Sequence, residues 1–212
     1  MAEGDDVEKA LRSLQQMLKH HDYSKAGPVI ASAKAQLLRA RVLIPSLQLQ
    51  RSKPRAVQLA QEITECGALI AIRRKDAEGF LRYVSQLQEF YNINATLRES
   101  GELKGDSRTN ESKITGLYLL LLLIQRDNAG YHMALEKLEM AEDGKIYRGD
   151  DPFINYPVKM EQWLSEGVYD KVWKATTGHD IPSEEFSLFT DVSDPLSYTN
   201  RDLSLGNSRL GT

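Results

Sequence analysis

Apolar residues recur at intervals of three and four along most of the chain, which is the spacing of one face of an α-helix. Two such faces come first, at residues 7–18 and 23–37, and Pro28 lies in the first turn of the second helix, where its missing N–H costs little. Pro54 opens a third helix. Asp76 is the expected N-cap of a fourth, and the short turn between helices three and four predicts an antiparallel hairpin.

The second half of the chain continues this pattern in shorter pieces between two polar stretches. We expect a loop open to early proteolysis at 94–112 and another loop at 143–155, since both stretches are rich in polar residues and glycine. The apolar run after the first loop predicts a helix that is buried nearly all round. The expected helices of this half lie at 112–126, around 131–138, at 157–165, at 168–175 and after Ser183.

The order of these elements indicates an all-α fold, an irregular helical-repeat (TPR-like) superhelix of stacked helix pairs. Successive pairs differ in length and share no strict period, and each leaves an apolar face that only a neighbouring pair can cover. No segment alternates apolar and polar residues long enough to predict a strand. We expect a helical-repeat domain at 1–192 and a disordered tail at 193–212, because the tail is polar and has no helical period.

The third expected helix carries two small residues side by side, Cys66 and Gly67. Glycine inside a helix is disfavoured by about 1 kcal/mol against alanine, so Gly67 predicts a crossing where another helix approaches closely. Cys66 is the only cysteine and has no Cys or His at metal-binding spacing. We therefore interpret Cys66 as a buried structural residue and not as a nucleophile.

Composition narrows the class of protein. The 212 residues are 41% hydrophobic and 27% charged, which is enough apolar material for a folded domain. A net charge of −3 argues against general nucleic-acid binding, and the cations at 73–75 are interpreted as a helix C-terminus rather than an RNA contact. The acidic start lacks a secretory pattern, and the longest apolar run is shorter than the about 20 residues of a membrane span. We expect a reducing compartment, the cytoplasm or the nucleus.

The common motifs of catalysis and cofactor binding are missing from the sequence. It has no HExxH pair, no GxSxG elbow and no glycine-rich phosphate loop. The prediction is a protein that is not an enzyme and that takes no cofactor, metal or small-molecule substrate.

Aromatic residues concentrate in the short helix pair at 157–175. Trp163, Tyr169 and Trp173 either fill the joint between the two helices or contact a partner protein, and both interpretations can hold on different rings. The candidate interface or structural residues are Pro157, Glu161, Trp163, Leu164, Gly167, Tyr169 and Trp173.

The segment 156–172 reads YPVKMEQWLSEGVYDKV and resembles a signature of the 26S proteasome non-ATPase regulatory subunit 8 family, a PCI-type subunit of the regulatory particle lid. Tyr156 stands where this family usually has a histidine. Residues 59–68 with 73–87, and then 181–189, resemble two further stretches of the family in the same order. Three ordered matches are more specific than any one of them.

The resemblance implies a non-catalytic lid scaffold in the cytoplasm and nucleus, whose partners are other lid subunits and neither nucleic acid nor membrane. The family continues into a winged-helix module after the region of Phe189, and residues 193–212 do not resemble it. We therefore expect a C-terminally truncated or misread chain without that module. Two alternatives stay open: a free-standing TPR-like adaptor that binds short peptides, and a PCI subunit of the signalosome or of a translation initiation complex.

Overall fold

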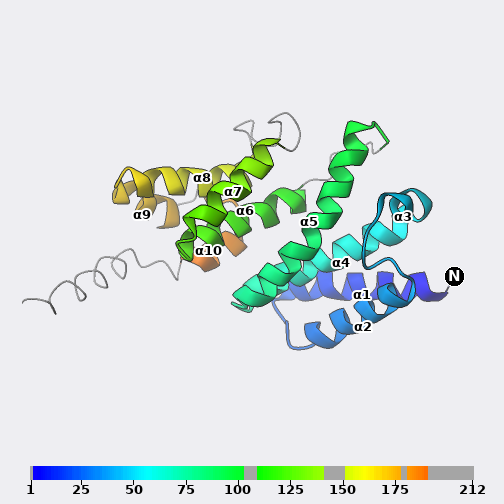
Figure 1. Ribbon diagram of the computed structural model, residues 1–212. Coiled ribbons are helices and arrows are strands. Elements are labelled where there is room, and N and C mark those ends of the chain that lie inside the picture. The colour runs from blue at the N-terminus through cyan, green and yellow to red at the C-terminus, as the bar shows by residue number, and fades with distance from the viewer. Residues whose placement is uncertain (1, 103–108, 141–150, 178–180, 191–212) are drawn as a thin grey trace, which may run out of the picture.

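The computed structural model describes residues 2–102, 109–140, 151–177 and 181–190, and most of this part is helical (Figure 1). The helices are α1 (Ala2–His20), α2 (Ala26–Arg39), α3 (Leu47–Ser52), α4 (Pro54–Arg73), α5 (Ala77–Glu99), α6 (Thr109–Ile124), α7 (Asn128–Met140), α8 (Pro152–Ser165), α9 (Tyr169–Thr177) and α10 (Glu184–Thr190). These ranges contain no strand, and consecutive helices pack in pairs, which confirms the predicted all-α helical-repeat class. The predicted tail at 193–212 lies outside the described residues.

The first layer of the fold consists of α1, α2 and α4 around a shared apolar core. The predicted faces at 7–18 and 23–37 both point into this core, where Leu14 and Ala26 are fully buried. α4 packs against both helices and adds Ile63 to the same core. The three- and four-residue spacing thus identified the buried faces correctly.

α4 and α5 form the predicted hairpin. α4 begins at Pro54, and Asp76 caps α5 because its Oδ1 accepts a hydrogen bond from the Gly79 N–H at 2.8 Å. Gly67 lies at the crossing of the two helices, where an added Cβ would lie 2.7 Å from Cε1 of Tyr83. The predicted close approach at Gly67 is confirmed, and its neighbour is a tyrosine ring.

α6 is buried nearly all round, as its apolar run predicted, because α5, α7 and α8 cover different sides of it. At Gly116 an added Cβ would overlap the backbone carbonyl oxygen of Phe153 in α8. Pro157 follows Phe153 by four residues and has no N–H to donate to that carbonyl. The backbones of α6 and α8 therefore approach closely at this point. In the described ranges, no helix is long and apolar enough to cross a membrane.

α8 begins earlier than predicted. The expected loop at 143–155 is wrong over its last residues, because Pro152 occupies the first turn of α8 and Asp151 caps it. The Asp151 carboxylate accepts a hydrogen bond from the Phe153 N–H at 2.9 Å. The expectation that Pro157 opens this helix is also wrong, since Pro157 lies in its interior.

The expected loop at 94–112 is too long at both ends, because α5 runs on past Asn94 and α6 begins before residue 112. The Asn94 side chain donates to Gln61 Oε1 of α4 at 2.9 Å, and Leu97 is buried one turn later. These tertiary contacts extend α5 through a stretch that looks polar in sequence. The sequence also gave no sign of α3, a short helix capped by Ser46.

Four of the described helices are followed by a non-glycine residue in the left-handed region, and each of these four residues can carry positive charge. The non-glycine residues with positive φ in the described ranges are His21, Arg41, Lys75 and Arg126, with φ between 56° and 59°. After α2, α4 and α6, the crossed backbone hydrogen bonds of a Schellman motif close the turn. Glycine is usual at this position, and a cation there gains from the negative end of the helix dipole.

α10 is joined to α4 and α6 by a cluster of charged side chains. Glu185 is 3% exposed and lies 2.8 Å from Arg73 of α4 and 2.8 Å from Lys113 of α6. Burial alone would raise the pKa of Glu185, but the hydrogen bonds from Lys113 and Arg73 outweigh it and lower the pKa to about 2. Arg73 also donates to the Tyr23 hydroxyl at 3.0 Å and reaches Glu184 at 3.1 Å. Arg73 is thus more than the helix-end cation that the sequence predicted.

Candidate functional site

The predicted helix pair at 157–175 is the α8–α9 hairpin, which lies at the end of the molecule away from α1, α2 and α3 (Figure 1). A Schellman motif ends α8: the Val168 N–H donates to the Trp163 carbonyl at 2.8 Å and the Gly167 N–H to the Leu164 carbonyl at 3.2 Å. Gly167 has φ of +71°, a conformation that side chains other than glycine rarely adopt. This glycine therefore sets the direction in which α9 leaves α8.

The inner side of the hairpin anchors it to the rest of the fold. Pro157 is buried, and its carbonyl accepts a hydrogen bond from the Tyr131 hydroxyl of α7 at 3.4 Å. Trp163 is partly buried and packs against the central core. Tyr156 donates from its hydroxyl to the Ala175 carbonyl at 3.3 Å, and burial raises its pKa to about 12, so the hydroxyl keeps its proton. These residues hold α8 and α9 in place.

The outer side of the hairpin exposes large apolar side chains. Leu164 is 41% exposed, Tyr169 57% and Trp173 55%. Tyr169 and Trp173 are one turn apart on α9 and share a face, whereas Val172 on the other face is buried. Trp163 is thus the ring that packs inward, whereas Tyr169 and Trp173 are exposed on the outer side.

The carboxylates of the hairpin find partners within α8. Glu161 accepts a hydrogen bond from the Ser165 hydroxyl at 2.6 Å, and Glu166 accepts one from the Gln162 amide at 2.9 Å. Each contact spans four residues of one helix, so the two carboxylates do not converge on a common point. They are surface charges that stabilise the last turns of α8.

The described residues offer little reactive chemistry. They include no group of three His, Cys, Asp or Glu side chains able to hold a metal. Cys66 is buried, as predicted, and burial, with the carboxylates of Glu65 and Glu62, raises its pKa to about 12. The thiol is therefore protonated at neutral pH and a poor nucleophile.

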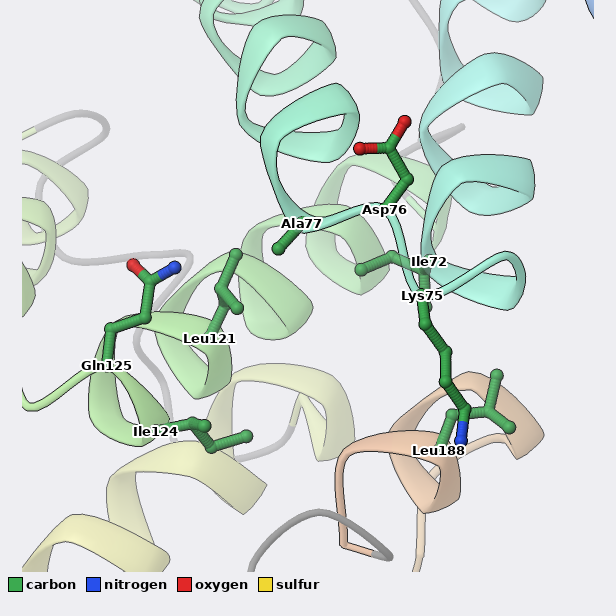
Figure 2. A pocket seen from close by; sticks show the side chains of 8 residues that line it. All are labelled: Ile72, Lys75, Asp76, Ala77, Leu121, Ile124, Gln125 and Leu188. Atoms are coloured by element: carbon green, nitrogen blue, oxygen red, sulfur yellow. The ribbon is translucent and has the colours of Figure 1, made fainter.

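A cavity of about 250 Å³ opens between the α4–α5 turn, α6 and α10 (Figure 2). Its walls are mostly aliphatic and include Ile72, Leu121, Ile124 and Leu188. The Asp76 carboxylate at its edge already caps α5 and points away from the space (Figure 2). No set of ionisable groups converges on this cavity among the residues that line it, so its surroundings suit apolar contact rather than acid–base catalysis.

Comparison with known proteins finds a family model and several relatives that this chain resembles. Residues 109–194, which include α6 to α10, match the model of the CSN8/PSMD8/EIF3K family. Over 183 residues the chain is 30% identical to the 26S proteasome regulatory subunit RPN12 of Saccharomyces cerevisiae, an alignment that covers 85% of this chain and 63% of that protein. The second half of the chain is thus similar to the CSN8/PSMD8/EIF3K family, and most of its length is similar to a proteasome regulatory subunit. The resemblance noted from the segment 156–172 is thereby confirmed, and the α8–α9 hairpin lies inside the family match.

Other proteasome regulatory subunits also align over most of the chain. It is 27% identical to the 26S proteasome regulatory subunit rpn12 of Schizosaccharomyces pombe, over 86% of this chain and 60% of that protein. It is 26% identical to the 26S proteasome non-ATPase regulatory subunit 8 homolog A of Arabidopsis thaliana, over 96% of this chain and 69% of that protein. The chain thus spans 63% and 60% of the lengths of the two yeast relatives.

Two residues that organise the site were missed in the sequence. Gly116 allows the backbone of α8 to approach α6 closely. The one sign of this approach in the sequence is a glycine inside an otherwise apolar run. Glu185 holds α10 to α4 and α6, but no local pattern pairs it with Arg73, more than one hundred residues earlier. Partners so distant in sequence become evident only when the chain is folded.

Proposed function

We propose that this chain is a non-catalytic structural subunit of the 26S proteasome regulatory particle lid, and that it supports ubiquitin-dependent protein degradation through protein–protein contacts. The observation that carries the proposal is the 30% identity to the yeast RPN12 subunit over 85% of the chain. The partners in this proposal are other lid subunits, and the setting is that of the particle, the cytoplasm and the nucleus.

The geometry supports a scaffold in preference to an enzyme. The cavity of Figure 2 is walled by aliphatic side chains, and the Cys66 thiol is buried and protonated. The buried charges of Glu185 and Arg73 are used to join helices. What the fold presents outward at α9 is a pair of aromatic rings, and aromatic residues are enriched at protein interfaces.

We propose that the outer side of the α8–α9 hairpin contacts a neighbouring subunit through Leu164, Tyr169 and Trp173. Tyr and Trp side chains dominate the binding energy of many interfaces because they bury large apolar areas at a small entropic cost. Pro157, Trp163 and Gly167 have the supporting role: they fix the angle at which these side chains are presented.

Recovery of bound proteins from a cell lysate tests the function. The tagged chain is incubated with lysate at low salt, and captured proteins are identified by mass spectrometry. We expect lid subunits of the proteasome among them. A full set of signalosome or initiation-complex subunits, or chaperones and peptides without lid subunits, contradicts the proposal and favours one of the alternatives.

Paired variants test the proposed interface separately. Replacing Tyr169 and Trp173 together by alanine removes both exposed rings, and we expect recovery of lid subunits to fall about tenfold or more. The matched control is Met133→Ala on α7, a side chain that is 70% exposed and lies outside the hairpin. If the parent chain recovers lid subunits and the double variant recovers them equally well, the function stands and the assigned interface is wrong.

A further inference from the structure

The charge of the chain is unevenly distributed. Residues 23–61 contain seven Lys and Arg residues and no Asp or Glu, although the whole chain has a net charge of −3. This stretch forms α2, α3 and the first half of α4. The rest of the chain is correspondingly acidic, so positive charge is concentrated in α2, α3 and the first half of α4.

Three of the seven cations have partners inside the fold. Lys34 donates to the Gln86 side chain at 3.0 Å and lies over the Tyr83 ring, while Arg51 and Arg55 form ion pairs with carboxylates at 2.7 Å and 3.0 Å. These contacts tie α2, α3 and α4 to their neighbours. Only three of the seven cations in residues 23–61 therefore stabilise the described fold through these contacts.

Three other cations, Arg39, Arg41 and Lys53, are exposed and make no ion pair within the described part of the chain. They follow the ends of α2 and α3 or close those helices. The nearby carboxylates of α1 are engaged elsewhere, since Asp6 pairs with a lysine of its own helix and Glu8 with two arginines. The positive charge at this place is not neutralised from within the described fold.

Large aliphatic side chains are exposed among these cations. Leu38 is 59% exposed, Ile44 78% and Leu47 39%. The connection that carries them is fixed from below, because Val42 is 1% exposed and its N–H donates to the Leu37 carbonyl at 3.0 Å. We refer to Leu38, Arg39, Arg41, Ile44, Leu47 and Lys53 as the α2–α3 surface.

We infer that the α2–α3 surface binds an acidic amphipathic segment of another protein. Unpaired cations interleaved with exposed aliphatic groups match a helix or extended peptide that presents carboxylates beside leucine-like side chains. The α2–α3 surface lies outside the family match at 109–194 and at the other end of the molecule from α8 and α9 (Figure 1), so the inference stands apart from the proposed function.

RNA and membranes fit this surface less well. No Phe, Tyr or Trp occurs between Tyr23 and Phe80, so the α2–α3 surface has no ring on which a base can stack. α3 has only six residues, too few for an amphipathic helix that lies in a lipid interface with an apolar face of several turns. Aliphatic anchors beside cations suit an acidic protein segment best.

Fluorescence anisotropy with the full chain tests the inference. The main probe is a short labelled amphipathic peptide of Glu and Leu. The comparison probes are the same peptide with Lys for Glu, the same peptide with Ser for Leu, a uridine oligonucleotide and vesicles containing phosphatidylserine. We expect the Glu–Leu peptide to bind most tightly, to bind less well as salt rises, and to lose affinity with either kind of substitution.

Substitutions then locate the binding to the surface. We expect Ile44→Ser and Arg39→Glu each to weaken binding of the Glu–Leu peptide about tenfold. The matched controls are Met133→Ser and Lys171→Glu, which change an exposed apolar residue and an exposed cation elsewhere, and which should leave affinity unchanged. Circular dichroism verifies that each variant is folded, and Arg41→Glu replaces Arg39→Glu if that variant is not.

The inference is overturned by either of two results. One is tighter binding of the oligonucleotide or the vesicles than of the Glu–Leu peptide. The other is peptide binding that is absent, or that responds equally to the control substitutions and to those in the α2–α3 surface.

Discussion

α4 and α6 are both enclosed by other helices, but only the sequence of α6 predicts a buried helix. Its last two turns, residues 117–124, consist almost wholly of leucine and isoleucine. α4 is buried at every position from 63 to 72, although that stretch includes Thr64, Glu65 and Gly67. α4 is enclosed because α1 and α2 cover one side and α5, α6 and α10 cover the other. Composition can predict burial when a helix is uniformly apolar, whereas the burial of a mixed helix depends on what stacks around it.

Two buried carboxylates, Glu65 and Glu185, show how the groups around a buried acid set the direction of its pKa shift. Glu65, in the middle of α4, accepts hydrogen bonds only from uncharged groups, among them Gln61 at 2.8 Å and Asn110 at 3.0 Å. Burial raises the pKa of Glu65 more than these hydrogen bonds lower it. Glu185 of α10 contacts Arg73, at the end of α4, and Lys113 of α6, and its pKa falls to about 2. At Glu65 the uncharged donors satisfy the carboxylate without offsetting the effect of burial on its pKa, whereas at Glu185 the two cations more than offset that effect.

The largest effect is expected at the junction of α4, α6 and α10. Glu185→Gln leaves Arg73 and Lys113 without their shared carboxylate, and we expect a loss of about 3 to 4 kcal/mol in the free energy of unfolding at neutral pH, measured by urea titration. Because the folded pKa is lowered, the contribution of Glu185 is complete above the ordinary value of 4.5 and is lost as pH falls toward about 2. The difference between parent and variant should shrink over that range.

A neighbouring glutamate serves as the control for this prediction. Glu184 also reaches Arg73, at 3.1 Å, but its side chain is 57% exposed. Glu184→Gln should cost no more than about 1 kcal/mol, since exposed ion pairs contribute little. Equal losses in the two variants would show that burial of Glu185 is not what makes its ion pairs strong.

The next effect is expected at the crossing of α6 and α8. Gly116→Ala places a methyl group against the Phe153 carbonyl, a backbone atom that cannot rotate away, and we expect a loss of about 3 kcal/mol. Gly27→Ala is the matched control, because an added Cβ in that part of α2 meets no atom within 4 Å. It should be neutral or stabilise the protein by about 0.5 to 1 kcal/mol, and a similar loss in both variants would refute the crossing.

A smaller effect is expected at the corresponding crossing of α4. Gly67→Leu must displace the Tyr83 ring, and we expect a loss of about 2 kcal/mol with a lower melting temperature. A double-mutant cycle with Tyr83→Ala measures how much of the loss arises from this contact, because that change removes the obstructing ring. An unchanged melting temperature, or a loss that Tyr83→Ala does not reduce, would exclude a tight crossing between these two residues.

The smallest effect is expected at Glu65. Glu65→Gln replaces a carboxyl group whose ionised form is disfavoured by burial. We expect the free energy of unfolding to change by no more than about 1 kcal/mol at neutral pH. A raised folded pKa means that the protein gains stability from this group as pH falls toward the unfolded value, the opposite of Glu185. Urea titrations from neutral to mildly acidic pH should show the Glu65→Gln variant losing this gain, and a variant that instead loses several kcal/mol at neutral pH contradicts the assignment.

Much of the fold was predictable because its signals are local. Pro54 begins a helix and Asp76 caps one, as predicted, and the face that contains Leu14 is buried. The loops were predicted less well. The polar stretch around Asn94 continues α5 because its amide donates to Gln61 on a neighbouring helix. The local composition around Asn94 cannot predict a hydrogen-bond partner on another helix.

The candidate site was predictable as a segment but not as a surface. The segment 156–172 was selected from its sequence, and Gly167 has the turn conformation that a glycine between two helices suggests. The sequence does not indicate which ring faces inward, and the packing places Trp163 against the core while Trp173 is exposed. The contact of Leu164, Tyr169 and Trp173 with a partner protein stays a prediction.

By itself the sequence determined that this chain forms helices, where most of them begin, and which face of each is apolar, because spacing and capping act over a few neighbouring residues. The tertiary structure alone decided that α4 is enclosed on both sides, that Arg73 meets Glu185, and that Leu38 and Ile44 of the α2–α3 surface are exposed. These features depend on which helices meet, and burial, pairing and exposure are properties of the assembled stack rather than of any single helix.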